Sequence, residues 1–205
     1  MARLLFAAQQ GVIAGVDEAG RGPLAGPVVA AAVVLGHSAP AGLDDSKKLS
    51  QPRRAELEAG IKDSCHWAVG MADVEEIDRI NIFAATMLAM TRAMAALCAQ
   101  LGHDPEDVLI DGNLTPAGRC DGWRWPARAL VGGDGLEPCI SAASIIAKEH
   151  RDRMMREAAQ RHPYYGWERN MGYGTKEHLA ALREHGPTPL HRRSFAPVAQ
   201  LDMFC

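Results

Sequence analysis

The sequence contains no closely spaced pair of cysteines. Its 5 cysteines are scattered over 205 residues, and their number is odd. This usage is typical of reduced thiols in a cytosolic protein and argues against a disulfide framework. The 8 histidines include no His-x-x-x-His pair on a predicted helix, so we do not expect a zinc site either.

Long hydrophobic runs are also absent. No segment reaches the roughly 18 consecutive apolar residues of a membrane span, and the apolar stretch at residues 1–8 is too short for a signal peptide. With 47% hydrophobic and 23% charged residues, the composition is that of an ordinary globular domain. We therefore expect a cytoplasmic protein that does not enter a membrane.

The sequence lacks a phosphate-binding loop. Val16-Asp17-Glu18 follows an apolar run, as the acidic residue of nucleoside triphosphatases does, but the Gly-x-x-x-x-Gly-Lys-Ser/Thr loop of those enzymes is missing. The glycines at 20, 22 and 26 do not stand in the order of strand, glycines and helix that binds dinucleotides. Both classes of nucleotide-binding protein are disfavoured.

The chain as a whole has no excess of positive charge, since its net charge is −3. Residues 148–193, however, carry ten Lys or Arg against six Asp or Glu, together with five of the histidines. A basic last third beside an acidic remainder suggests a surface that faces a polyanion. The alternative is chance clustering of charges on solvated helices.

Apolar runs bounded by glycine and proline predict buried strands, and longer periodic stretches predict helices. The first two strands, joined by a glycine turn, are expected to form an antiparallel hairpin. We expect an α/β domain over 1–160, a helical and loop part of the same domain over 161–198, and a tail over 199–205. The predicted strands are 11–18, 27–35, 65–71, 108–113 and 128–131, and the predicted helices are 51–62, 73–80, 82–101, 139–161 and 176–185.

Helix starts are indicated by Ser50, by Asp73 with Glu76 in a capping-box pattern, and by Thr175. The methionines of the helix over 82–101 recur on one face and are expected to pack in the core.

Two adjacent acids, Asp17 and Glu18, end the first predicted strand. Carboxylates in an apolar setting need a metal ion or an arginine as partner. Because neighbouring side chains on a strand point to opposite faces, both acids reach one site only if the strand ends or bulges there. The turn Gly20-Arg21-Gly22-Pro23 is a plausible end.

Other segments supply further acids. Asp111 ends a second apolar strand, and Asp152 shares a helix face with Ser144 and Lys148, since the three are four residues apart. If these carboxylates converge, they need cations between them, and oxygen ligands suit Mg²⁺ or Mn²⁺. Two such ions about 4 Å apart serve phosphodiester hydrolysis.

Six motifs that occur in one order resemble those of bacterial ribonuclease HII, over residues 12–198. They are Gly15–Pro23 (GVDEAGRGP), Asp45–Leu49 (DSKKL), Leu109–Gly112 (LIDG), Ser141–Lys148 (SAASIIAK) with Arg151-Asp152, Gly172–Thr175 (GYGT) and His191–Phe195 (HRRSF).

The resemblance implies a ribonuclease H-like fold, with a mixed central β-sheet flanked by helices and a small helical C-terminal appendage. It implies an endonuclease that cuts the RNA strand of RNA–DNA hybrids and single ribonucleotides embedded in duplex DNA, leaving 3′-hydroxyl and 5′-phosphate ends. A catalytically silent hybrid-binding protein with the same fold is the alternative, and we expect a monomer in either case.

The resemblance also implies roles for individual residues. The acids that match the family's metal ligands are Asp17, Glu18, Asp111 and Asp152, and Asp134 is a further candidate. The residues that match its ribonucleotide-recognition elements are Gly20, Arg21, Gly22 and Tyr173, which suits recognition of the 2′-hydroxyl that marks RNA.

Lysines near these motifs are candidates for phosphate contacts, namely Lys47, Lys48 and Lys148, although Lys47 and Lys48 could equally be plain solvated lysines. Two positions depart from the family pattern: Met171 and Gly132 stand where a basic residue is expected. Both departures would weaken phosphate binding and leave the chemistry unaffected.

The tail resembles the short motif by which bacterial proteins bind the replication sliding clamp. Its anchors would be Gln200, Leu201, Met203 and Phe204. The alternative is a tail that folds back on its own core.

Overall fold

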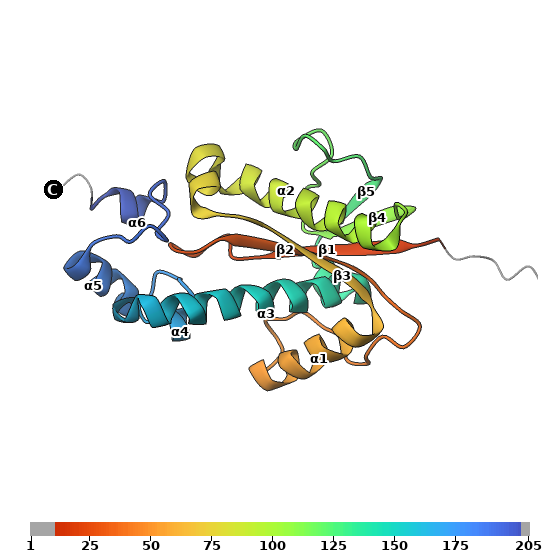
Figure 1. Cartoon of the computed structure of the whole chain (residues 1–205), viewed down its shortest axis with the longest axis horizontal. Helices are drawn as coiled ribbons and strands as arrows, with labels where there is room; N and C mark the ends of the chain where they lie inside the picture. The colour runs from red at the N-terminus through yellow and green to blue at the C-terminus, as the bar shows by residue number, and fades with distance from the viewer. Residues whose placement is uncertain (1–10, 202–205) are drawn as a thin grey trace, which may run out of the picture.

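The computed structural model describes residues 11–201 and contains a five-stranded mixed sheet in the order β3-β2-β1-β4-β5 (Figure 1). β1 pairs antiparallel with β2, which pairs antiparallel with β3, while β4 runs parallel to both β1 and β5. The mixed sheet and the first hairpin are therefore as predicted. The strands are β1 (Ile13–Ala19), β2 (Val28–Val34), β3 (His66–Ala72), β4 (Asp107–Asp111) and β5 (Ala127–Leu130).

Helices cover both faces of the sheet. α2 packs on one face, against β2 and β3, and α3 packs on the other, against β1 and β2, with α1 beside it (Figure 1). The shorter helices α4 to α6 gather at one end of the sheet (Figure 1). The α-helices are α1 (Gln51–Ser64), α2 (Val74–Leu101), α3 (Pro138–Arg161), α4 (Trp167–Asn170), α5 (Lys176–His185) and α6 (Ala196–Ala199), and the 3₁₀ turns are η1 (Gly133–Gly135) and η2 (Pro163–Tyr165).

The position of β2 in the sheet explains why its sequence is apolar without alternation. Ala30 and Ala32 belong to the core under α2, whereas Ala31 and Val33 belong to the core under α3. A strand covered on both faces has no solvent side that would favour polar residues.

α2 contains both helices predicted between 73 and 101. The break between them lies at Asn81, whose backbone angles, φ 68° and ψ 164°, are not helical. The Asn81 side chain accepts a hydrogen bond from the amide of Ala84 and starts the helix again. The capping box of Asp73 and Glu76 is confirmed. Thr175 caps α5 as predicted, whereas Ser50 precedes α1 without a side-chain cap bond.

By length and composition α2 is apolar enough to cross a membrane, contrary to our expectation that no segment is. It is instead the core helix of one face, since its methionines Met87, Met90 and Met94 are buried against the sheet as predicted. Apolar residues near its outer side pack against the loop before β5.

A second core lies at the C-terminal end. Tyr165 and Trp167 stack there with ring centroids 5.1 Å apart, and the cluster includes Leu24 and Ala25 from the turn after β1 and Met155 from α3. Segments that are far apart in the sequence thus share one core, which lies beyond the end of the central strand β1.

Candidate active site

Two acids meet because their strands are parallel neighbours. Val16 of β1 pairs with Ile110 of β4, so the next residues, Asp17 and Asp111, lie side by side where β4 ends. Asp17 is 4% exposed and accepts a hydrogen bond from the amide of Glu18 at 2.7 Å.

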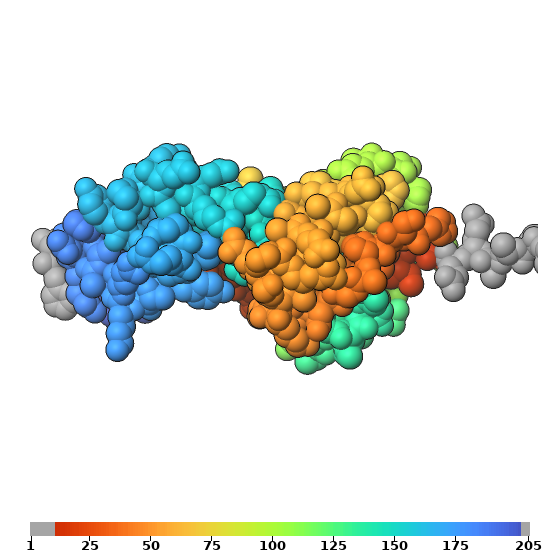
Figure 2. Space-filling model, turned by 90° about the horizontal axis from the view of Figure 1, so that it is seen from below, coloured from red at the N-terminus to blue at the C-terminus, as the bar shows by residue number. Residues whose placement is uncertain are grey.

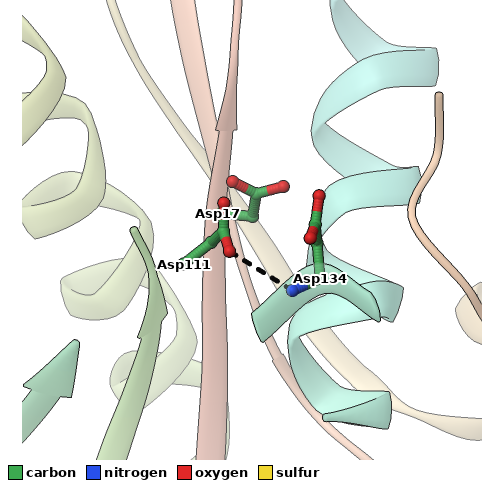
Figure 3. Close-up of side chains that lie close together, drawn as sticks. All are labelled: Asp17, Asp111 and Asp134. Carbon is green, nitrogen blue, oxygen red and sulfur yellow. Dashed lines mark hydrogen bonds between the residues drawn. The ribbon is translucent and has the colours of Figure 1, made fainter. Parts of the chain in front are cut away.

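Asp134 joins this pair from the turn that follows β5 (Figure 3). Its amide donates to the Asp111 carboxylate at 3.3 Å. One carboxylate oxygen from each of Asp17, Asp111 and Asp134 lies within 4.8 Å of the other two. We call these three residues the acid cluster. The sequence offered Asp134 as a further candidate, and the structure places it beside the strand acids.

Glu18 lies apart from the acid cluster. β1 continues through Ala19, so the expected strand end after Glu18 is wrong. In the ladder with β2, Asp17 is opposite Ala31 and Glu18 is opposite Ala30, whose side chains belong to cores on opposite faces. Glu18 instead accepts a hydrogen bond from Arg21 at 3.3 Å.

Asp152 lies on α3 and is held by Lys148. The ammonium of Lys148 is 2.7 Å from both carboxylate oxygens of Asp152. One turn earlier, Ser144 bonds to Ser46 at 2.9 Å. The predicted helix face of Ser144, Lys148 and Asp152 is therefore present, but Asp152 is not one of the three acids that converge.

The acid cluster is electrostatically costly. Burial raises the pKa of Asp17 well above its ordinary value, and the carboxylates of Glu18 and Asp111 raise it further. Burial and then the charge of Asp111 also raise the pKa of Asp134. The pKa of Glu18 is raised by burial, against the opposing charge of Arg21.

A cation would relieve this repulsion. Three carboxylates offering oxygen atoms within 4.8 Å of one another form a donor set suited to a hard divalent ion. The residues present therefore fit Mg²⁺ or Mn²⁺, and they contain no sulfur or imidazole donor that would favour zinc.

A cavity of about 330 Å³ lies beside the acids. It collects residues predicted from four separate motifs. Figure 2 shows that the surface narrows to a waist between the C-terminal part and the segment that contains α1. Its lining includes Glu18, Gly20, Arg21, Gly22, Ser46, Lys47, Ser144, Lys148, Arg151 and Tyr173.

The turn after β1 lies close to Tyr173 in the lining of this cavity. A Cβ atom on Gly22 would lie 3.4 Å from the Tyr173 ring, and the ring itself is 49% exposed. Gly20 has φ +97°, a conformation that side-chain-bearing residues rarely adopt. The turn and the aromatic ring together form one wall that a sugar could contact.

A directed chain of hydrogen bonds holds the Tyr173 backbone. The Trp167 indole donates to His178 Nε2 at 3.1 Å, so His178 carries its proton on Nδ1 and donates to the Tyr173 carbonyl at 2.9 Å. His191 accepts from the Thr188 amide on Nδ1 and donates from Nε2 to His178 Nε2 at 3.0 Å. Burial lowers the pKa of His178, and lowers that of His191 to about 3, which favours the neutral form of both rings.

The remaining predicted residues are two loop lysines and the tail motif. Lys47 lies 3.8 Å from Asp134 and lines the cavity, whereas Lys48 pairs with Asp44 at 3.0 Å, away from it. Of the tail motif, Gln200 is exposed and Leu201 packs partly against the C-terminal core. Met203 and Phe204 lie outside the described residues.

Sequence reasoning assigned no role to two buried arginines beside the turn, Arg151 and Arg192. Both occur inside the motifs that carried the family resemblance, but basic residues in a basic segment predict exposure, and nothing local marks them as buried.

The fold and the acid cluster together define a hydrolase of the ribonuclease H-like class. The family model for ribonuclease HII matches residues 14–198. The ribonuclease HII of Novosphingobium aromaticivorans is 75% identical over 194 residues, which are 94% of this chain and 99% of that protein. The chain belongs to the ribonuclease HII family.

Solved structures agree on the fold. The ribonuclease HII of Archaeoglobus fulgidus, in a complex with PCNA, is 27% identical with a TM-score of 0.71, over 88% of this chain and 93% of that one. The ribonuclease H2 from Pyrococcus horikoshii is 24% identical with a TM-score of 0.74, over 94% and 97% of the two chains.

The repulsion within the acid cluster makes a prediction about stability. Because folding raises the pKa of Asp17 and Asp134, the folded state loses stability as the pH rises above their ordinary values. We expect Asp111→Asn to raise the free energy of unfolding of the metal-free protein by about 1 kcal/mol at pH 8 and by less at pH 5. Urea denaturation in EDTA measures both values.

Added Mn²⁺ should raise the melting temperature of the wild type and leave that of Asp111→Asn nearly unchanged, because the variant lacks one ligand. The exposed Asp121→Asn is the matched control and should behave as wild type. Equal stability of Asp111→Asn and wild type without metal, with equal Mn²⁺ shifts, would contradict the account.

Proposed function

We propose that this protein is a metal-dependent endonuclease that cuts the RNA strand of RNA–DNA hybrids and single ribonucleotides embedded in duplex DNA. The observation that carries the proposal is the acid cluster, three carboxylates from β1, β4 and η1 that lie beside a cavity lined by basic residues. Membership of the ribonuclease HII family supports the same substrate class.

The metal ligands in this proposal are Asp17, Glu18, Asp111 and Asp152, with Asp134 beside them. Bound Mg²⁺ or Mn²⁺ would lower the pKa of a water molecule and stabilise the charge on the leaving oxygen, so that the products would carry 3′-hydroxyl and 5′-phosphate ends. The protein holds its carboxylates in a partly buried site, where burial and then the neighbouring carboxylates of Glu18 and Asp111 raise the pKa of Asp17.

Substrate binding is assigned to the cavity. Lys47 and Lys148 line it and would contact phosphates, and Lys48 would extend this contact outside it. The backbone of Gly20, Arg21 and Gly22 would grip the 2′-hydroxyl, and the Tyr173 ring would pack on the sugar that follows, where a second 2′-hydroxyl fits poorly.

In the cell this activity would serve ribonucleotide removal from DNA, by a monomer in the cytoplasm. The silent hybrid-binding alternative retains the same surface but would have no use for buried acids that repel one another. The two are separated by a cleavage assay with and without metal.

The decisive variant is Asp17→Asn, assayed on duplex DNA that contains one ribonucleotide. We expect kcat to fall by more than about 100-fold, because a metal ligand is lost, with substrate affinity in a gel-shift experiment retained. Asp121→Asn, the same change at an exposed site, should be fully active. Full activity of Asp17→Asn would refute the assignment, and a wild type that binds but never cuts would favour the silent protein.

Tyr173→Ala tests the recognition of the ribonucleotide junction. We expect kcat/KM to fall about tenfold on a single embedded ribonucleotide, which corresponds to roughly 1.4 kcal/mol, and to change little on a uniform RNA–DNA hybrid. Tyr164→Ala, which also removes an exposed tyrosine ring, is the control. Equal losses on the two substrates would show that the ring does not read the junction.

We further propose that the tail, through Gln200, Leu201, Met203 and Phe204, binds the bacterial sliding clamp. The Archaeoglobus fulgidus relative was solved with PCNA, which gives the proposal a precedent within the family. Deletion of residues 200–205 should weaken clamp binding at least about tenfold by removing the anchors, with cleavage unchanged. Equal clamp affinity of the intact and truncated chains, measured by titration, would exclude the motif.

A further inference from the structure

Two arginines are buried beside the turn without an acidic partner. Arg151 is 1% exposed and Arg192 is 0% exposed. Within residues 11–201, no carboxylate lies within 4.0 Å of either guanidinium. A buried charge needs compensation, and here every hydrogen bond that the structure shows for the two guanidinium groups goes to a backbone carbonyl group.

Arg192 holds the turn that follows β1. Its guanidinium donates to the carbonyls of Gly20 at 2.6 Å, Arg21 at 2.9 Å and Gly26 at 2.9 Å. The first two carbonyls belong to the Gly20–Gly22 turn itself. Arg192 therefore links the two ends of the segment 20–26.

Arg151 joins the same segment to the Tyr173 loop. Its guanidinium donates to the carbonyls of Pro27 at 3.0 Å and Ala25 at 3.0 Å. It also donates to the carbonyl of Met171, two residues before Tyr173, at 2.9 Å. The turn lies directly on this side chain, because a Cβ atom on Gly20 would come within 2.0 Å of Arg151 Nε.

Backbone hydrogen bonds complete the assembly. Leu24 N donates to Gly172 O at 2.8 Å, and Arg192 N donates to Leu24 O at 2.8 Å. The segment 20–27 is thereby held between the loop at 171–172 and the loop at 190–192, although these are more than 140 residues away in sequence.

Arginine is chemically suited to this task. Its planar guanidinium has five N–H donors in a fixed fork and can satisfy three carbonyls at once, whereas the lysine ammonium is a point charge on a flexible stem. Burial lowers the pKa of Arg151 to about 10 and that of Arg192 to about 9, which leaves both charged at neutral pH.

We propose that Arg151 and Arg192, the arginine pair, are positioning residues that fix the Gly20–Gly22 turn relative to Tyr173 and thereby set the preference for a single embedded ribonucleotide over a uniform hybrid. This inference rests on the proposed function. The arginine pair touches no substrate in this account and acts only through the turn and the ring.

The test compares Arg192→Lys and Arg151→Lys with wild type on the two substrates, in the presence of Mn²⁺. We expect kcat/KM on the single ribonucleotide to fall about tenfold or more, since small displacements of positioning groups have large effects on rate. The loss on the uniform hybrid should be less than about threefold. Arg183→Lys, at an exposed position of α5, should match wild type on both.

A double-mutant cycle separates positioning from general stability. If Arg192 acts through Tyr173, adding Arg192→Lys to Tyr173→Ala should cause little further loss of preference for the single ribonucleotide. Independent, fully additive losses, equal losses on the two substrates, or unchanged kinetics would each overturn the proposal.

Circular dichroism and melting temperatures establish that the variants fold. If only one lysine variant folds, that variant carries the test, and if neither folds, the arginine pair serves stability alone and the proposal fails. A wild type that cuts neither substrate would refute the proposed function, whereas an active wild type with unaltered lysine variants would refute only the role of the arginine pair.

Discussion

The repulsion among Asp17, Asp111 and Asp134 is the constraint on which the site depends. Parallel pairing of β1 with β4 forces the first two carboxylates together on adjacent strands, and the turn after β5 adds the third. Such an arrangement reduces the stability of the protein by itself, and it persists because the sheet and the cores on both of its faces hold the strands in register. The energetic cost of the acids and their suitability for divalent ions have the same physical origin.

The buried carboxylates and the buried guanidinium groups of this molecule lie in opposite electrostatic environments. In the acid cluster, burial and neighbouring carboxylates raise the pKa of Asp17 and Asp134, and the oxygen donors form a set suited to a cation. The nearby Arg151 and Arg192 instead each donate three hydrogen bonds to neutral carbonyl groups. The first arrangement suits binding and chemistry, and the second suits a rigid support.

Most of the secondary structure could be predicted because local patterns determine it. Apolar runs closed by glycine or proline located all five strands, and the capping box at Asp73 placed the start of α2. The prediction was wrong where a property depends on the neighbours. The strand was expected to end at Glu18, yet pairing of Glu18 with Ala30 extends β1 to Ala19. α2 was not recognised as long and apolar enough for a membrane, although its burial against the sheet explains that composition.

The sequence by itself determined the element order, the acids near the ends of two strands and the family, because these depend on residue types and short spacings. Only the tertiary structure decided which acids converge. Asp134 joins Asp17 and Asp111 while Asp152 pairs with Lys148, since the register of β4 and the path of the turn after β5 are long-range properties. It likewise decided that Arg151 and Arg192 are buried. A residue's type does not specify whether three carbonyls from distant segments will surround it.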